Sequence, residues 1–199
     1  MNMELRADGL HITGYVNVPG RYSRPVTTPH GRVIEVIEQR AFDRAIKRAK
    51  EIRVLMDHNK DRVLASTKDQ TLKVKEDEIG LRADTVITDE EVINAAKDNK
   101  IRGWSFNMKN VVDEVEERSE NLPLRKVKDF DMDEITLAIH RVPVYAATSV
   151  EIRAGEEENE EHRAISQDIT FCDRSEKKEY NSGLKKRLEE LKKEDNNNE

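Results

Sequence analysis

The sequence predicts a mainly β domain with two or three peripheral helices, an α+β fold whose sheet closes into a barrel or curves strongly. Seven or more short apolar runs recur between turn signals, and several of them alternate with polar residues. Before residue 155, two segments have the pattern of a helix. Aromatic residues make up 5% of the chain, which predicts a modest, aliphatic core.

The strands are predicted from alternation and from the turns that interrupt it. The first run alternates until Pro19 and Gly20 stop it, and the polar segment 57–61 follows a compact apolar run. Residues 76–80 have the composition of a hairpin connection. The expected strands are 11–18, 33–37, 52–56, 62–65, 72–74, 81–87, 101–112, 125–129 and 133–139.

Two helices are expected outside the sheet. Phe42, Ala45, Ile46 and Ala49 recur at helical spacing within 41–50, so this segment should pack one face on the sheet. A second helix should run to residue 99. Thr88 is its expected N-cap, with Glu91 at the third helical position.

Composition divides the chain into two parts near residue 155. Residues 1–155 are expected to form the folded domain, whereas about half of the residues in 156–199 are charged. We expect 156–199 to be a charged, flexible linker followed by a short amphipathic helix with Leu184, Leu188 and Leu191 on one stripe. That helix is either a marginal solvated helix or one that binds a partner or a second copy.

Charge and cysteine content exclude several classes of protein. The chain has 35 basic and 41 acidic residues among 199, a formal charge of -6, which disfavours a nucleic-acid-binding protein. One cysteine, Cys172, cannot form an internal disulfide framework or a Cys-rich zinc module. No apolar run reaches the roughly 18 to 20 residues that cross a bilayer, so we expect a protein of the cytoplasm without a membrane partner.

Three polar residues lie where predicted strands can present them. His58 follows the end of an apolar strand, and Ser105 alternates with Trp104 and Phe106, so it faces away from them. Glu134 shares a strand face with His140, but six residues separate those two by roughly 20 Å. Taken alone, His58 also fits a noncatalytic residue of a surface turn, and Ser105 also fits an ordinary serine of a strand.

A serine nucleophile needs a base to take its proton and a third group to orient that base. His58, Ser105 and Glu134 supply a base, a hydroxyl and a carboxylate from three separate β segments. The spacing permits them to meet and does not require it.

The order of short motifs over about residues 8–152 resembles the prohead (procapsid) maturation proteases of tailed phages, a serine protease family related in fold to the herpesvirus assemblins. The individual motifs are loose, but their joint order is fairly specific. They are Gly14–Tyr15, Glu35–Ile37 with Ala41–Phe42, Leu55–His58, Glu76–Leu81, Gly103–Ser105 and Glu134–Tyr145.

The resemblance implies a function, a site and a set of partners. It places the nucleophile at Ser105, the base at His58 and the acidic residue at Glu134, with Arg141 as a candidate oxyanion donor. It implies an assemblin-like barrel and a serine endopeptidase that forms an acyl-enzyme and uses no metal or organic cofactor. The substrates would be the major capsid protein and the scaffold, and the enzyme itself, inside the assembling prohead in the host cytoplasm. Whether the active form is a homodimer or a larger assembly stays open.

Departures from the family pattern keep alternatives open. Asn107–Met108 follow Ser105–Phe106 where relatives often have glycine and phenylalanine, Gln39–Arg40 precede Ala41, and Thr136 stands where serine is usual. The alternatives are a noncatalytic scaffold or assembly chaperone with a protease-like fold, a generic β-barrel binding module, and a cysteine hydrolase that pairs Cys172 with His162.

Overall fold

The computed structural model describes residues 1–28, 31–139, 161–166 and 168–175. Two helices and thirteen strands form in this part of the chain. The helices are α1 (Ala41–Arg48) and α2 (Glu90–Lys97). The strands are β1 (Asn2–Arg6), β2 (Gly9–Asn17), β3 (Val26–Thr28), β4 (Gly31–Ile37), β5 (Arg53–Met56), β6 (Asn59–Ser66), β7 (Leu72–Glu76), β8 (Leu81–Ile87), β9 (Gly103–Glu116), β10 (Leu124–Asp131), β11 (Glu134–Ala138), β12 (Glu161–Ser166) and β13 (Thr170–Asp173).

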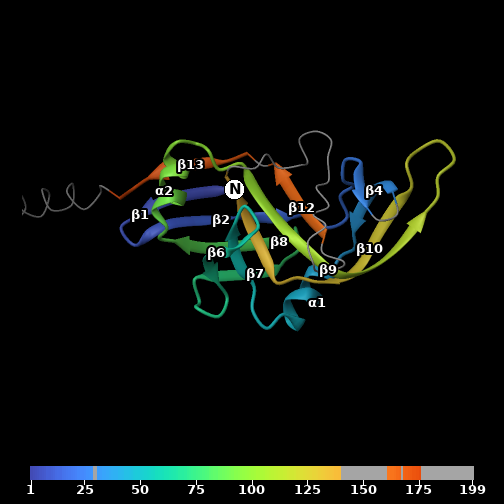
Figure 1. Ribbon diagram of the computed structural model, residues 1–199, viewed down its shortest axis with the longest axis horizontal. Helices are drawn as coiled ribbons and strands as arrows, with labels where there is room; N and C mark the ends of the chain where they lie inside the picture. Colours follow the sequence, from blue (N-terminus) through green and yellow to red (C-terminus); the bar gives the residue numbers. More distant parts are fainter. Residues whose placement is uncertain (29–30, 140–160, 167, 176–199) are drawn as a thin grey trace, which may run out of the picture.

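The strands form two sheets (Figure 1). The first has five strands in the order β13-β1-β2-β8-β7. The second has eight, with the order β3-β4-β10-β9-β11-β5-β6 and with β12 also paired to β9. Most pairs are antiparallel, but β1–β13, β4–β10 and β5–β11 are parallel. In the second sheet the long strand β9 pairs with three strands, β10, β11 and β12.

The expected closed barrel or strongly curved sheet is wrong, although the mainly β, α+β composition with two helices is confirmed. In the described residues β13 and β7 end the first sheet without pairing with each other, and β3 and β6 end the second in the same way. A barrel needs its first and last strands to pair. Alternation within each strand predicts which face is buried but carries no information on that long-range pairing, so two open sheets fit the same pattern.

One hydrophobic core joins the two sheets. It takes side chains from β1, β2 and β8 of the first sheet and from β5, β9 and β11 of the second. Helix α1 packs against β10 and β7, and its Phe42 meets Phe106 and Phe130 edge to face, each with ring centroids 5.2 Å apart. The predicted inner face of this helix is confirmed at Phe42 and Ala45, which are buried.

The N-cap of α2 differs from the sequence prediction. Asp89, not Thr88, caps α2, and its side chain accepts a hydrogen bond from the Val92 N–H. Helix α1 has no side-chain cap from its own N-cap residue, Arg40. Instead the buried carboxylate of Glu76, at the end of β7, accepts from the N–H groups of Arg40 (2.7 Å) and Asp43 (2.8 Å). A hairpin residue thus supplies the anion that a helix N-terminus favours.

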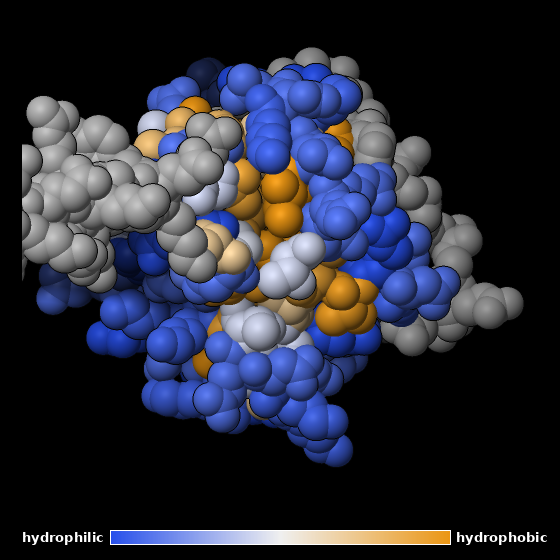
Figure 2. Space-filling view, turned by 90° about the vertical axis from the view of Figure 1, so that its left-hand side faces the viewer, coloured by the Kyte–Doolittle hydropathy of each residue, from blue (hydrophilic) through white to orange (hydrophobic). Residues whose placement is uncertain are grey.

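The surface carries the high charge of the sequence. Figure 2 shows a largely hydrophilic face with one apolar area near its centre. Neither α1 nor α2 has the length or apolar character that crossing a membrane requires, and the described residues contain no other helix.

Two strands follow the expected boundary at residue 155. β12 pairs antiparallel with β9, and β13 pairs parallel with β1, so both extend the sheets of the first part. The division into 1–155 and 156–199 stays a prediction. The acidic segment 156–160 and the expected tail helix around 184–191 lie outside the described residues.

We predict that Glu76→Ala lowers the free energy of unfolding by about 2 kcal/mol, because the N–H groups of the N-cap residue Arg40 and of Asp43 in α1 lose a charged acceptor. Urea unfolding measures the change, and Glu78→Ala, at an exposed position of the same hairpin, is the control. If the two variants are equally stable, Glu76 does not cap the helix.

Candidate active site

Strand β11 lies between β9 and β5 and brings their side chains together. Its Thr136 pairs with Ser105 of β9, and its Leu137 pairs with Met56 at the end of β5. Trp104 and Phe106 are fully buried in the core, so Ser105 projects from the opposite face of the sheet, as the alternation predicted. Glu134 shares that face with Thr136, two residues along the strand.

A tight turn aims His58 at this face. Met56 pairs with Asn59, so Asp57 and His58 alone connect β5 to β6, and both have left-handed backbones with φ of 49° and 58°. Two left-handed residues are typical of a type I′ hairpin turn, which favours Asn, Asp and Gly. Asp57 is hydrogen-bonded to β11 and to the residue that follows it. The Asp57 N–H donates to the Leu137 carbonyl (3.0 Å), and the Asp57 carboxylate accepts from the Ile139 N–H (2.8 Å).

His58 bridges Ser105 and Glu134. Its Nδ1 lies 2.6 Å from Glu134 Oε1 and its Nε2 lies 2.7 Å from Ser105 Oγ. An ionised carboxylate only accepts, so the Nδ1–H donates to Glu134 and leaves Nε2 facing the serine. The Thr136 hydroxyl lies 3.3 Å from the same Nδ1. Ser105 and Glu134 are buried, whereas the His58 side chain keeps 17% of its surface exposed.

Asn107 holds the start of β11 in place. Its side-chain oxygen accepts from the backbone N–H groups of Asp133 (3.3 Å) and Glu134 (3.2 Å), and its amide donates to the Asp133 carboxylate. Burial raises the pKa of Asp133, but this hydrogen bond and the charge of Lys109 outweigh it and hold the pKa below its ordinary value. The asparagine that departs from the family pattern after Ser105 therefore positions Glu134.

Strand β12 adds His162, which the sequence analysis considered only as the partner of Cys172 and not beside His58. The strand pairs with Gly103–Met108, and β11 pairs with part of the same stretch, so the two strands lie on opposite edges of β9. The His162 ring lies 4.1 Å from the His58 ring, between centroids, and its Nδ1 is 3.7 Å from Glu134 Oε1. Burial, aided by the charges of His58 and Arg163, lowers the pKa of His162 to about 3. No pattern around residue 162, in a charged segment after the predicted boundary, signals this position.

The next residue of β12 contacts the serine through its backbone. Ser105 Oγ lies 2.9 Å from the carbonyl oxygen of Arg163 as well as 2.7 Å from His58 Nε2. A serine has one hydroxyl proton, and a carbonyl oxygen can only accept. The hydroxyl therefore donates either to neutral His58 or to Arg163; in the second case a protonated His58 donates to Ser105.

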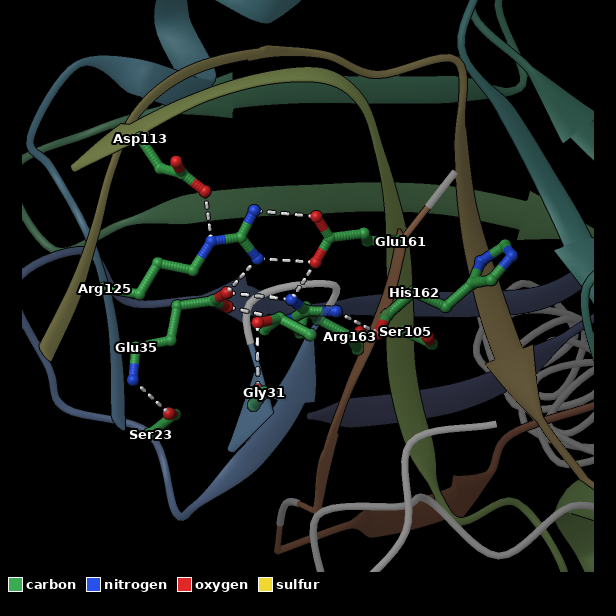
Figure 3. A network of polar contacts seen from close by, with 10 residues as sticks. Ser23, Gly31, Glu35, Ser105, Asp113, Arg125, Glu161, His162 and Arg163 are labelled. Atoms are coloured by element: carbon green, nitrogen blue, oxygen red, sulfur yellow. Dashed lines mark hydrogen bonds and ion pairs between the residues drawn. The ribbon is translucent and has the colours of Figure 1, made fainter. Parts of the chain in front are cut away.

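A buried network of charges anchors β12 (Figure 3). The Arg163 guanidinium donates to both oxygens of Glu35 on β4 (2.7 and 2.8 Å), and Arg125 of β10 donates to both oxygens of Glu161 (2.6 and 2.7 Å). Arg125 also donates to Glu35 (3.0 Å) and to Asp113. Burial raises the pKa of Glu161, but the hydrogen bond from Arg125 and the charge of Arg163 overcome it, so the pKa lies below its ordinary value.

The remaining candidates lie outside the described residues or away from this site. Arg141, His140 and His30 lie outside the described residues. Cys172 is exposed on β13 in the first sheet, and no hydrogen bond joins it to His162 within the described part of the chain. The geometry gives no support to a cysteine hydrolase built on that pair.

A hydroxyl, an imidazole and a carboxylate, hydrogen-bonded in that order, are the groups on which serine hydrolases depend. The chain matches the family model of the caudovirus prohead serine proteases over residues 1–163. It belongs to this family, which is one of serine proteases. Searches of curated proteins and of solved structures each found no match.

The burial of His162 predicts a stability that falls in acid. Its pKa, about 3 in the folded protein against 6.5 for a free histidine, means that the unfolded chain binds more protons between these values. The free energy of unfolding therefore decreases as the pH falls from 6.5 toward 3. This residue contributes at most about 1.4 kcal/mol per pH unit, and less because its side chain is 29% exposed.

Urea unfolding of wild type and His162→Gln at several pH values measures this contribution. The variant should lose less stability than wild type below pH 6.5 and change in parallel with it at pH 7 to 8. The groups that face the ring are His58, Glu134, Arg163, Lys109 and Lys60, and both proteins retain them. Parallel curves throughout the acid range would contradict the burial argument.

Proposed function

We propose that Ser105 is the nucleophile of this serine protease, His58 its general base and Glu134 the group that orients the base. The observation that supports this assignment is the position of His58, with Nε2 2.7 Å from Ser105 Oγ and Nδ1 2.6 Å from Glu134 Oε1. Both contacts fall within the reach that general base catalysis needs. The same three residues carry the motifs of the resemblance.

Acylation begins when the Ser105 hydroxyl donates to His58 instead of the Arg163 carbonyl. Ser105 Oγ attacks the scissile carbonyl as its proton passes to Nε2, and the new imidazolium is stabilised by the Glu134 carboxylate. His58 then returns that proton to the leaving amine as the peptide bond breaks. Water, deprotonated by His58, hydrolyses the acyl-enzyme and regenerates the Ser105 hydroxyl.

The proposed substrates are the capsid and scaffold proteins of the assembling prohead in the host cytoplasm, together with the protease chain itself. Membership of the prohead protease family supports capsid proteins as substrates. A homodimer or larger assembly and an oxyanion contact from Arg141 remain part of the proposal. No feature of the described residues calls for a nucleic acid or a membrane in this role.

We predict that Ser105→Ala abolishes processing of the coexpressed capsid and scaffold proteins and of the protease itself. Removal of the nucleophile lowers kcat by on the order of 10⁶-fold in serine proteases. Processing is followed by gel electrophoresis and mass spectrometry, and circular dichroism shows whether the variant is folded. Ser175→Ala, at a half-buried serine whose hydroxyl contacts the Asp173 carboxylate, should process like wild type. Cleavage by folded Ser105→Ala would place the nucleophile elsewhere.

We predict that Glu134→Gln lowers kcat about 10⁴-fold and His58→Ala about 10⁶-fold, because the first change removes orientation and charge while the second removes the base. The single-turnover rates are measured by mixing scaffold protein with purified protease in excess over it. Thr136→Val is the matched control, since Thr136 touches the same Nδ1 from 3.3 Å but supplies no charge. A wild-type rate for Glu134→Gln would remove this carboxylate from the mechanism.

A further inference from the structure

Within the described ranges, three side chains that can ligate a metal ion meet beside Ser105. They are His58, Glu134 and His162, and one ligand atom from each lies within 4.8 Å of the others. They come from three segments far apart in the sequence: the β5–β6 turn, β11 and β12. The proposed hydrolysis uses His58 and Glu134 but assigns no role to His162.

His162 presents an unsatisfied nitrogen to this cluster. Its Nδ1 is buried and has no hydrogen-bond partner among the described residues. The nearest carboxylate oxygen, Glu134 Oε1, is 3.7 Å away, beyond hydrogen-bond distance. A buried polar atom that is left unpaired costs free energy, and such atoms in native proteins often mark a site for a ligand.

We propose that His58, His162 and Glu134 form an inhibitory site for a divalent transition-metal ion such as Zn²⁺. Two imidazoles and a carboxylate are a known zinc set, with a fourth position left for water. Ca²⁺ and Mg²⁺ prefer ligand sets made of oxygen, so the two nitrogens discriminate against them. The inference rests on the proposed function in one respect: inhibition requires that His58 be the base.

The geometry fits such an ion after a small adjustment. Ligands lie about 2.0–2.2 Å from zinc, so two of them can be at most about 4.3 Å apart. The spread of 4.8 Å between the ligand atoms therefore has to close by roughly 0.5 Å or more, which side-chain rotation can supply. The side chains of His58 and His162 keep 17% and 29% of their surfaces exposed, so an ion can reach them from solvent.

A bound ion would stop the proposed reaction without any covalent change. It would occupy the lone pair of His58 Nε2, or would bind Nδ1 while the proton of Nδ1 moves to Nε2. In both cases Nε2 loses its free lone pair, and the ion draws the Glu134 carboxylate away from the imidazole. The ring could then neither keep its orientation nor accept the Ser105 proton. Removal of the ion by a chelator would restore both groups, so the inhibition would be reversible.

Binding is tested on full-length Ser105→Ala protein, which cannot cleave itself under the proposed mechanism, without a histidine tag and with Cys172→Ser to remove the exposed thiol. Isothermal titration with ZnCl₂ should give one site per chain, and zinc should raise Tm by mass action. His162→Gln in this background should weaken binding at least tenfold. His11→Gln, on β2 of the other sheet, should bind like the parent. Equal affinity for His162→Gln and the parent, or no binding below millimolar zinc, would overturn the site.

Inhibition is measured separately on the active protein with Cys172→Ser. Zinc should inhibit cleavage of the scaffold protein, EDTA should reverse it, and His162→Gln should need at least tenfold more zinc for the same fractional loss of its own metal-free rate. Magnesium should have no effect in either assay. Zinc that binds with the expected His162 dependence but leaves the rate unchanged would overturn the inhibitory role and the assignment of His58 as base. Inhibition without that dependence would overturn this site alone.

Discussion

The pairing of β11 with two different strands is the constraint on which the site depends. One edge of β11 meets β9 in the register that sets Thr136 opposite Ser105, and its parallel pairing with β5 sets Leu137 opposite Met56. A shift of one residue in either register would turn every side chain of β11 to the other face. Glu134 would then enter the hydrophobic core, where an unpaired carboxylate is costly. Core packing and site geometry thus require the same register.

The β5–β6 turn adds a local strain to this framework. Left-handed backbones, as at Asp57 and His58, are uncommon for residues other than glycine, although Asp and His adopt them more often than most. Such residues cluster at functional sites. The Asp57 contacts with Leu137 and Ile139 hold the turn against β11 and offset part of that cost. The His58 imidazole therefore contacts Ser105 and Glu134 from a turn whose backbone conformation is restricted.

Buried ion pairs are weak evidence for stability, because desolvation of the charges opposes their attraction. The Glu35–Arg163 and Arg125–Glu161 pairs are better understood as fixing the position of β12, a hypothesis in which the charges pair fully in only one register. In that register the His162 ring contacts the His58 ring, and the Arg163 carbonyl oxygen lies within hydrogen-bond distance of the Ser105 hydroxyl. A strand near the end of the family match thus completes the surroundings of the site.

Local patterns predicted much of this structure. The alternation around Ser105 gave its strand and its face, the turn after Met56 marked His58, and the hairpin at 76–80 is confirmed by the pairing of β7 with β8. Long-range pairing was not predictable, which is why the barrel was wrong. Charged residues are normally exposed, so the burial of Glu35, Arg125 and Arg163, at 3%, 2% and 2% exposure, had no signal in the sequence. The position of His162 beside His58 had no signal either, since it depends on which edge of β9 its strand joins.

The central claim is that the fold makes one hydroxyl, that of Ser105, more reactive than every other serine in the chain. Treatment of the folded protein with a serine-reactive phosphonate, followed by peptide mapping with mass spectrometry, tests this directly. Ser105 should be the modified residue, and neither urea-unfolded wild type nor folded His58→Ala should be modified at this position. Modification at a different serine, or equal modification of Ser105 in the folded and unfolded protein, would contradict the claim.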